Sequence, residues 1–354
     1  MGEEMNAAVL HAVADLRYER VRMPAVGEGE VLVRVRAAGV CGSDLGRVMT
    51  TGTYRFPTIP GHEFCGEIAE TGARVKAFSR GDRVVVAPIL PCGRCEFCES
   101  GDYGLCEDYD YLGSRRDGGF AEYAVAPERN LLRLPDGLSY LEGAGVEPAA
   151  VTLHGMLRVG IGVGDTVAVL GCGALGLFAL QFARIMGASR VYAVDIAPDK
   201  LALAELLGAD ECVNSAEVDA VERILELTGG RGVNAALETA GVAQTQEQCL
   251  RMVRKKGRVL YLGTAHRDVV IPPKSFERIV RGELTLRGSW NSYSAPFPGV
   301  EWRATIDHMR SGAFKLKPLI SHVFDLSEAP KVFADLVHRE YPYTKVMFEP
   351  KEGP

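Results

Sequence analysis

Four cysteines lie within fifteen residues, at a spacing suited to binding a metal ion. They are Cys92, Cys95, Cys98 and Cys106, in the pattern Cys-x2-Cys-x2-Cys-x7-Cys. Four thiolates close a tetrahedral shell around zinc, and a closed shell leaves no position for a substrate. We therefore expect a structural zinc ion here, with free or disulfide-bonded cysteines as the alternative.

Two turn-rich segments further upstream carry a second set of side chains suited to metal chemistry. Cys41, Ser43 and Asp44 supply a thiol, a hydroxyl and a carboxylate, and His62 and Glu63 add an imidazole and another carboxylate. Taken alone, a histidine is more often structural, and a cysteine is often a small buried apolar residue. Those interpretations weaken because the four-cysteine segment already predicts a metal-binding protein.

A further carboxylate, Glu147, stands before Pro148 and a helix-like run, Ala149 to Val159. Because proline fixes the backbone after it, Glu147 is a plausible metal ligand. The same residue could equally be an acid at a helix N-terminus, where the helix dipole favours negative charge. The sequence leaves both interpretations open.

A glycine-rich segment with the pattern Gly-x-Gly-x-x-Gly indicates a dinucleotide site. Gly171 allows a tight turn, Gly173 lets the backbone approach a pyrophosphate, and Gly176 lets the following helix pack closely on the strand. The helix that starts at Ala174 and Leu175 offers free N–H groups to the phosphates. All five residues are therefore predicted to bind the cofactor.

The surroundings of this motif are those that a dinucleotide site requires. A buried strand, Thr166 to Leu170, precedes it, a helix from Leu175 to Met186 follows, and the next strand, Val191 to Val194, ends at Asp195. Asp195 can accept hydrogen bonds from both ribose hydroxyls and would repel a 2′-phosphate, which favours NAD over NADP. Lys200, in the next predicted helix, is assigned to the same site.

Two patterns of secondary structure divide the chain. The first part is β-rich, and Val31, Val33 and Val35 alternate with other residues as in a strand with one buried face. After Asp195, helices alternate with continuously apolar strands, as in a parallel sheet covered on both faces. Past Trp290 this alternation ends, and the tail is predicted to hold two helices, near 302–310 and 328–337, and a strand at 345–348.

Length and composition limit the classes to which the protein can belong. The 354 residues suffice for two domains, and 47% are hydrophobic and 24% charged, as in ordinary globular proteins. A net charge of −6 gives no general attraction to nucleic acids or anionic membranes. The longest apolar run, Val167 to Leu180, is shorter than the roughly 20 residues of a membrane span. Without a recognisable leader, we expect a cytoplasmic protein whose cysteines serve metal binding or catalysis.

In their order along the chain, these motifs resemble those of the zinc-dependent medium-chain dehydrogenases. The shared elements are Cys-Gly-Ser-Asp, Gly-His-Glu, the four cysteines, Asp-Gly-Gly-Phe-Ala-Glu-Tyr, Glu-Pro and the glycine motif, and they span essentially the whole chain. The resemblance implies an α/β protein with a GroES-like, β-rich catalytic domain at 1–153. A Rossmann domain with a doubly wound parallel sheet follows at 154–291, and 292–354 return to the catalytic domain. The cofactor would lie in the cleft between them.

The resemblance also implies roles for the upstream residues. Cys41, His62 and Glu147 match the protein ligands of a catalytic zinc, and Glu63 lies beside the metal as a candidate direct ligand. These three matches argue against a zinc-free reductase of the same fold.

Proton handling is implied in the same way. Asp44 matches an acid that orients the metal-bound histidine, and Ser43 matches the hydroxyl that takes the alcohol proton. Relatives often carry a histidine three positions after that serine, but this chain has Gly46 there. The proton is therefore expected to leave through water or the cofactor ribose.

Segments outside the general motifs resemble the polyol branch of the family, which includes sorbitol dehydrogenases and galactitol-1-phosphate 5-dehydrogenases. They are Leu112 to Gly119, Gly288 to Ser294 and Pro298 to Trp302. The implied reaction is oxidation of a secondary alcohol of a polyol or polyol phosphate, such as galactitol 1-phosphate, to a ketone. The hydride passes to NAD, and two zinc ions, one catalytic and one structural, are expected per chain.

These segments also suggest substrate-binding residues. Arg115 or Arg116 is a candidate to grip a phosphate, because a guanidinium binds phosphate oxygens in a two-pronged manner. In an extended segment consecutive residues point to opposite sides, so only one arginine is expected to face the site. A solvated charge pair near Asp117 is the alternative. Trp290 and Tyr293 are expected to line the same pocket or to pack in the core.

Other functions remain open at this stage. Within the family, the substrate could instead be a free polyol such as sorbitol or xylitol, or L-threonine. From another class, a zinc-ribbon binding module with a vestigial Rossmann domain is conceivable, although the acidic balance counts against a nucleic-acid partner. We expect a homodimer or homotetramer, formed by strand pairing through the edge of the Rossmann sheet.

Overall fold

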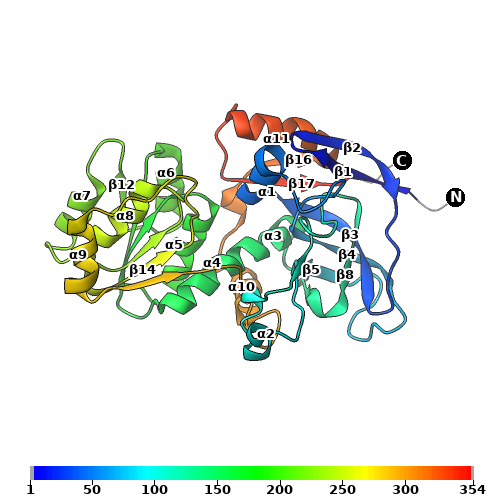
Figure 1. Ribbon diagram of the computed structural model, residues 1–354, viewed down its shortest axis with the longest axis horizontal. Coiled ribbons are helices and arrows are strands. Elements are labelled where there is room, and N and C mark those ends of the chain that lie inside the picture. Colours follow the sequence, from blue (N-terminus) through cyan, green and yellow to red (C-terminus); the bar gives the residue numbers. More distant parts are fainter. Residues whose placement is uncertain (1–3, 352–354) are drawn as a thin grey trace. The chain divides into compact units, whose positions relative to one another are not determined.

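The computed structural model describes residues 4–351, and the chain forms two compact units (Figure 1). The first unit comprises Met1–Glu147, Tyr293–Gly312 and Ile320–Pro354, and the second comprises Pro148–Ser292 and Ala313–Leu319. The chain thus enters the second unit after residue 147, where the sequence suggested 153. Residues 313–319, expected in the returning segment, belong to the second unit. The predicted ranges also include 1–3 and 352–354, which lie outside the described residues.

The first unit is built mainly on antiparallel strands. Its largest sheet has the order β16-β17-β3-β4-β5-β9, with β8 paired to β3. Two small sheets pair β1 with β2 and β6 with β7. The strands are β1 Glu4–Ala12, β2 Asp15–Arg22, β3 Glu30–Gly39, β4 Glu63–Thr71, β5 Arg83–Val86, β6 Ile89–Leu90, β7 Asp110–Tyr111, β8 Tyr123–Pro127, β9 Leu131–Arg133, β16 Ile320–Asp325 and β17 Lys345–Glu349.

Helices of the first unit are short, apart from two in the returning segment. They are α1 Gly42–Gly46, the π-helical turn η1 Arg47–Thr51, α2 Glu96–Ser100, α3 Tyr140–Ala144, α10 Val300–Arg310 and α11 Ala329–His338. The 3-10 turns are η2 Tyr103–Leu105, η3 Glu128–Asn130, η4 Lys317–Leu319 (in the second unit) and η5 Leu326–Glu328. The short helices place side chains in the loops between strands, where functional residues commonly lie.

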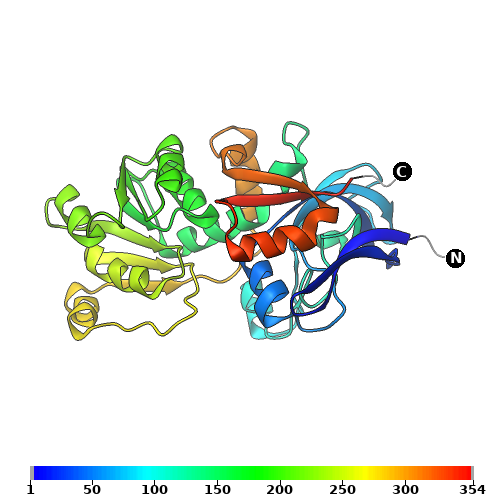
Figure 2. The same ribbon diagram turned by 90° about the horizontal axis from the view of Figure 1, so that it is seen from above.

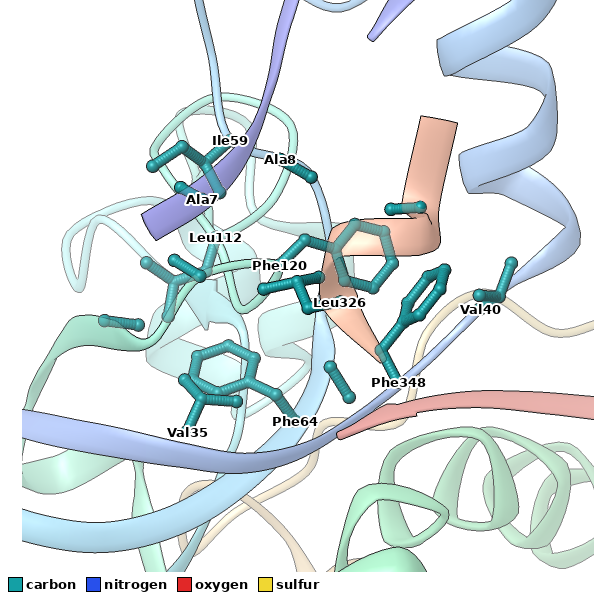
Figure 3. Close-up of a cluster of buried hydrophobic side chains, with 14 of the residues drawn as sticks. Ala7, Ala8, Val35, Val40, Ile59, Phe64, Leu112, Phe120, Leu326 and Phe348 are labelled. Carbon is teal, nitrogen blue, oxygen red and sulfur yellow. The ribbon is translucent and has the colours of Figure 1, made fainter. Parts of the chain in front are cut away.

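The chain's last strand completes the sheet that the early strands begin. β17 pairs with β3, with Phe348 opposite Ala38 and Met347 opposite Gly39. Figure 3 shows Phe348 beside Phe120, and their ring centroids are 5.3 Å apart with the rings edge to face. Both rings are fully buried, so the C-terminal segment belongs to this unit's core rather than to its surface.

The second unit has a six-stranded parallel sheet of order β12-β11-β10-β13-β14-β15. Figures 1 and 2 show helices on both faces of this sheet. The strands are β10 Thr166–Leu170, β11 Arg190–Asp195, β12 Glu211–Asn214, β13 Val233–Glu238, β14 Val253–Tyr261 and β15 Thr285–Gly288. The helices are α4 Val146–Val159 (whose first two residues belong to the first unit), α5 Ala174–Ile185, α6 Pro198–Leu206, α7 Ala220–Leu227, α8 Ala243–Met252 and α9 Pro273–Gly282.

This topology creates one position suited to a ligand. The chain runs from β10 outward through β11 to β12, then returns to β13 on the other side of β10 and continues outward. Ligands of doubly wound sheets bind at such a reversal, beyond the carboxyl ends of the strands. The glycine motif follows β10, at that position.

The prediction of continuously apolar strands is correct for the centre of the sheet and wrong for its edges. β10 and β13 are almost wholly buried, whereas all four residues of β15 are exposed and β12 has one buried residue. Edge strands have one neighbour and less cover, so they need fewer apolar side chains. Because β12 has few buried apolar residues, its sequence shows no recognisable strand pattern. No helix within residues 4–351 is long and apolar enough to cross a membrane.

Candidate metal centres and cofactor site

The four predicted zinc-binding cysteines come together in the first unit. Their sulfur atoms all lie within 4.8 Å of one another, and Cys92 and Cys98 are 3.9 Å apart. Zinc–sulfur bonds of about 2.3 Å in a tetrahedron place sulfur atoms roughly 3.8 Å apart. All four cysteines are unpaired, so the disulfide alternative does not apply to this arrangement. The donor set therefore fits a closed zinc site.

Local backbone features hold these cysteines in place. Cys95 is the N-cap of α2, which ends at Gly101 in the left-handed conformation (φ 84°). Backbone amides point at the sulfur atoms, from Gly93 to Cys98 (3.4 Å) and from Cys92 to Cys106 (3.2 Å). The amide of Arg94 lowers the pKa of Cys92 to about 6, which favours the thiolate that a metal requires.

A second, mixed cluster forms from Cys41, His62 and Glu63. One ligand atom from each lies within 4.8 Å of the others. His62 and Glu63 are buried, and Cys41 is half-buried at the N-cap of α1. A thiolate, an imidazole and a carboxylate are all zinc ligands, and three protein ligands are typical of catalytic sites that keep an open position.

Asp44 orients the imidazole of this mixed cluster. Its Oδ1 lies 3.1 Å from Nδ1 of His62, and its Oδ2 accepts a hydrogen bond from the Cys41 amide. Burial opposes the charge on both side chains, yet their mutual attraction lowers the pKa of Asp44 and raises that of His62 well above its usual value. With Nδ1 engaged, Nε2 is left to bind a metal.

Glu147 lies near the mixed cluster but is not one of its three mutually close ligands. It occupies the first turn of α4, the position that its alternative interpretation predicted. The Tyr111 hydroxyl donates to its Oε1 at 3.4 Å, and the ring of Tyr111 lies 5.8 Å from that of His62. Burial raises the pKa of Glu147 to about 7, with Glu63 acting in the same direction and His62 in the opposite one.

Lys345 is a partner that sequence reasoning missed. It lies on β17 with its side chain 3% exposed, forms an ion pair with Glu63, and donates to the carbonyl of Val40 at 3.0 Å. Gly39, on the neighbouring strand β3, leaves the space that this pair occupies. A lone lysine near the C-terminus carries no local signal, because only the pairing of β17 with β3 brings it to Glu63.

Arg47 is a second missed residue at the mixed cluster. Its Nη1 donates to the Ser43 hydroxyl at 2.9 Å and lies 3.3 Å from Oδ1 of Asp44. The spacing offered a signal, because residues three and four apart share a helix face. Ser43 itself is exposed and donates to the sulfur of Cys41 at 3.3 Å.

The glycine motif has the shape that a dinucleotide requires. Gly171 adopts φ 96°, and a Cβ on Gly176 would collide with the carbonyl oxygen of Gly171. Gly173 is the N-cap of α5 with nothing within 4 Å of the position its Cβ would take. Ala174 and Leu175 begin that helix, and no side chain caps it. Open space beside uncapped helical amides fits a pyrophosphate.

Asp195 is held next to this loop at the end of β11. Its Oδ2 accepts from the Cys172 amide at 2.6 Å, and its Oδ1 accepts from the amides of Ile196 and Ala197. The carboxylate is thus fixed beside the glycine motif, as a ribose-binding acid must be. Lys200 lies in the first turns of α6, which begins at Pro198.

The two arginines proposed for substrate binding differ in their surroundings. The expectation of an extended segment is wrong, since 113–115 form a turn. Arg116 lies 3.4 Å from Asp110 and 3.8 Å from Glu30, so its charge is compensated. Arg115 stacks instead on Tyr54 and Tyr109, with its guanidinium carbon 4.1 and 4.5 Å from the ring centroids. The buried Nε of Arg115 has no hydrogen-bond partner among the described residues.

The other two proposed substrate residues, Tyr293 and Trp290, lie in different units. Tyr293 is 1% exposed in the first unit, where its hydroxyl accepts from the Ile89 amide and its ring stacks with Trp302. That is the environment of a core residue. Trp290 belongs to the second unit and is 58% exposed.

Comparison with known proteins identifies the class. The chain matches the alcohol dehydrogenase GroES-like domain over residues 27–136 and the zinc-binding dehydrogenase domain over residues 174–308. It therefore belongs to the zinc-dependent medium-chain dehydrogenases, with a GroES-like and a Rossmann-like domain, and to their polyol dehydrogenase group.

Two relatives illustrate the group within the family to which the chain is similar. The chain is 38% identical to galactitol 1-phosphate 5-dehydrogenase of Escherichia coli K12, over 89% of this chain and 91% of that one. It is 34% identical to sorbitol dehydrogenase of Bacillus subtilis, over 98% of both chains.

Solved structures of similar proteins support the same family. Galactitol-1-phosphate dehydrogenase from Escherichia coli superimposes with a TM-score of 0.93 at 37% identity, covering 98% of this chain and all of that one. A putative zinc-binding dehydrogenase from Sinorhizobium meliloti 1021, bound to NADP, has a TM-score of 0.90 at 34% identity, with the same coverage.

Proposed function

We propose that the protein oxidises a secondary alcohol of a polyol phosphate resembling galactitol 1-phosphate to a ketone, with NAD as hydride acceptor. The observation that carries this proposal is the mixed Cys41–His62–Glu63 cluster, with the exposed hydroxyl of Ser43 beside it. The likeness to galactitol 1-phosphate 5-dehydrogenase supports the substrate class.

Cys41, His62 and Glu147 would hold the catalytic zinc, with Glu63 close enough to replace a ligand. When bound there, zinc acts as a Lewis acid that makes an alcohol more acidic. Asp44 keeps the imidazole in the tautomer that binds the metal, and Tyr111 directs the carboxylate of Glu147.

Ser43 is the proposed proton acceptor. Its oxygen takes the proton of the substrate hydroxyl. Its own proton, directed at the sulfur of Cys41 before the reaction, goes to solvent, to which the side chain is exposed. NAD, held at the glycine motif and Asp195, would supply the acceptor for the hydride of the carbinol carbon. The products are the ketone, NADH and one proton.

Asp195 is the basis for proposing NAD rather than NADP. Its carboxylate, fixed by three backbone amides, would repel a 2′-phosphate. The Sinorhizobium relative, whose structure contains NADP, makes this preference a point to test.

Arg115 is the proposed phosphate ligand. Its stacking on two tyrosines fixes the plane of the guanidinium, while Arg116 is already paired with acids. Tyr109 also lies 6.2 Å from Tyr111, whose ring contacts His62, so Arg115 is linked to the mixed cluster through two aromatic rings.

A homo-oligomer formed through β15 also remains a proposal. All four residues of this edge strand are exposed, including Leu286 at 39%, and Phe276 and Val280 of the preceding helix α9 are 57% and 65% exposed. Unpaired edges and apolar side chains favour pairing with a second copy. Sedimentation equilibrium gives the mass directly, and a monomer at all concentrations would contradict the proposal.

The test of the function is a screen for NAD reduction over paired free and phosphorylated polyols. We expect galactitol 1-phosphate or a close analogue to give the highest kcat/KM, with free galactitol and sorbitol lower. A higher kcat/KM for free sorbitol, xylitol or L-threonine would instead assign the alternative substrates. Absence of turnover with every alcohol and both cofactors would refute the proposal.

A further inference from the structure

The hydrogen bonds of Ser43 are unusually specific for an exposed hydroxyl. Arg47 donates to Oγ at 2.9 Å, and the hydroxyl donates to the sulfur of Cys41 at 3.3 Å. A serine oxygen has one proton and two lone pairs. Among the described residues, these two contacts engage the proton and one lone pair, and they leave one lone pair to accept a proton.

The same guanidinium nitrogen also contacts the acid behind the metal ligand. Nη1 of Arg47 lies 3.3 Å from Oδ1 of Asp44, the atom that faces Nδ1 of His62. Arg47 begins η1, directly after α1, so Ser43, Asp44 and Arg47 lie on one helical face. Its side chain is 25% exposed, and Asp44 is fully buried.

We propose that Arg47 is a positioning residue that holds Ser43 in the one orientation in which its free lone pair can accept the substrate proton. Gly46 has no side chain and gives Ser43 no support, and a guanidinium group carries only donors and has no lone pair with which to accept a proton. Arg47 therefore acts through Ser43, not as a further member of a proton chain. The inference rests on the proposed role of Ser43.

The experiment compares kcat and KM of Arg47→Met, Arg47→Lys and Arg47→Ala, using the best polyol from the screen. We expect Arg47→Met to lower kcat about 10- to 100-fold with KM changed less than about twofold, because misplacing a reacting group affects only the chemical step. Arg47→Lys should recover part of the loss. Millimolar guanidinium chloride should raise kcat of Arg47→Ala, while an equal concentration of sodium chloride should not.

Arg83→Met is the matched control. Arg83 lies in the same unit, its side chain is 21% exposed, and it donates to two backbone carbonyls, those of Pro135 and Leu138. Its loss should lower stability but leave kcat unchanged. The double variant Ser43→Ala/Arg47→Met should be no slower than Ser43→Ala alone, since Arg47 acts through Ser43.

Three results for Arg47→Met would overturn the inference: kcat and KM both unchanged, a raised KM with unchanged kcat, or loss of zinc in proportion to activity. The second would mean that Arg47 binds substrate, and the third that it only supports the metal centre. If Ser43→Ala is slow and Arg47→Met is not, the Arg47 inference alone fails. If Ser43→Ala keeps the wild-type kcat, the proposed proton transfer fails, and the role of Arg47 with it.

Discussion

The four-cysteine cluster and the Cys41–His62–Glu63 cluster lie in the same unit, yet their surroundings differ. The four sulfur atoms receive hydrogen bonds mostly from backbone amides within their own short segment. The ligands of the mixed cluster contact side chains from distant parts of the chain, including Lys345 from the last strand. When one short segment supplies all the ligands, the metal is suited to stabilising the fold of that segment. When several distant elements supply and support the ligands, the site can respond to a bound substrate.

The acidic side chains around the two clusters also differ in their burial. Around the mixed cluster, Asp44, Glu63 and Glu147 are buried acids, each adjacent to a cation, another acid or a hydroxyl. Buried carboxylates are costly, and several of them together are typical of functional sites. The cysteine segment carries its acids on the surface, where they cost little. The contrast supports a catalytic role for the first cluster and a structural one for the second.

The sharpest test of this contrast removes a proposed ligand of the catalytic zinc, either Cys41 of the mixed cluster or the nearby Glu147. Cys41→Ala or Glu147→Gln should lower kcat about a thousandfold or more, since a Lewis-acid metal supplies several kcal/mol of stabilisation and about 1.4 kcal/mol is tenfold. Thermal unfolding should be nearly unchanged. Cys212→Ala, at an exposed cysteine on β12, is the control. Activity retained in either ligand variant would assign the chemistry elsewhere.

Lys345→Met tests whether the distant support of the mixed cluster matters. Removing one partner of a buried ion pair leaves an uncompensated charge, which costs about 3–5 kcal/mol. For a unit of this size we expect Tm to fall by about 10 °C, and Glu63→Gln added to Lys345→Met should recover part of the loss. The exposed pair of Lys331 with Asp335 is the control, and Lys331→Met should change little. Equal Tm values for Lys345→Met and wild type would refute the role of the pair.

Cys98→Ser tests the other cluster. Because structural zinc binding is coupled to folding, we expect a loss of roughly 2–3 kcal/mol and a Tm lower by about 5–10 °C. The folded fraction should still turn over substrate at low temperature. Unchanged Tm and zinc content would show that these cysteines do not hold a structural metal.

Arg115→Ala tests whether Arg115 binds the phosphate of a substrate held at the mixed cluster. Loss of a charge-assisted hydrogen bond is worth about 1.5–3 kcal/mol, so KM for the phosphorylated polyol should rise about 10- to 100-fold. KM for the free polyol should change much less. Arg116→Ala is the matched control, because Arg116 already pairs with Asp110 and Glu30. Equal effects of Arg115→Ala on both substrates would exclude a phosphate contact.

The smallest expected effect comes from a change outside both clusters. Asp195→Ala removes the charge that would repel a 2′-phosphate, and the ratio of kcat/KM for NAD to that for NADP should fall by about tenfold. Zinc content should stay as in wild type. An unchanged ratio would mean that Asp195 does not contact the ribose.

Local patterns were enough to predict much of this structure. Thr166–Leu170 is a strand with the predicted bounds, and the four cysteines meet as their spacing indicated. The two-domain fold and the family are confirmed by the comparisons. Such features follow from residues close together in sequence, where one turn or one strand decides the geometry.

What the sequence could not predict depends on pairing between distant segments. Lys345 meets Glu63 across 282 residues, and nothing near Lys345 in the chain indicates this. Tyr293 looked equally suited to a pocket or a core, and only burial decides for the core. Arg115 and Arg116 are adjacent and chemically alike, and a turn that the sequence did not reveal gives them different neighbours.

The central claim, that one unit holds two metal centres of different purpose, is tested most directly by counting zinc. Mass spectrometry of the purified protein should give about two zinc ions per chain. The Cys41→Ala variant should retain about one, remain folded and form no NADH. One zinc per chain in both proteins, with activity lost only in the variant, would contradict a catalytic zinc at the mixed cluster.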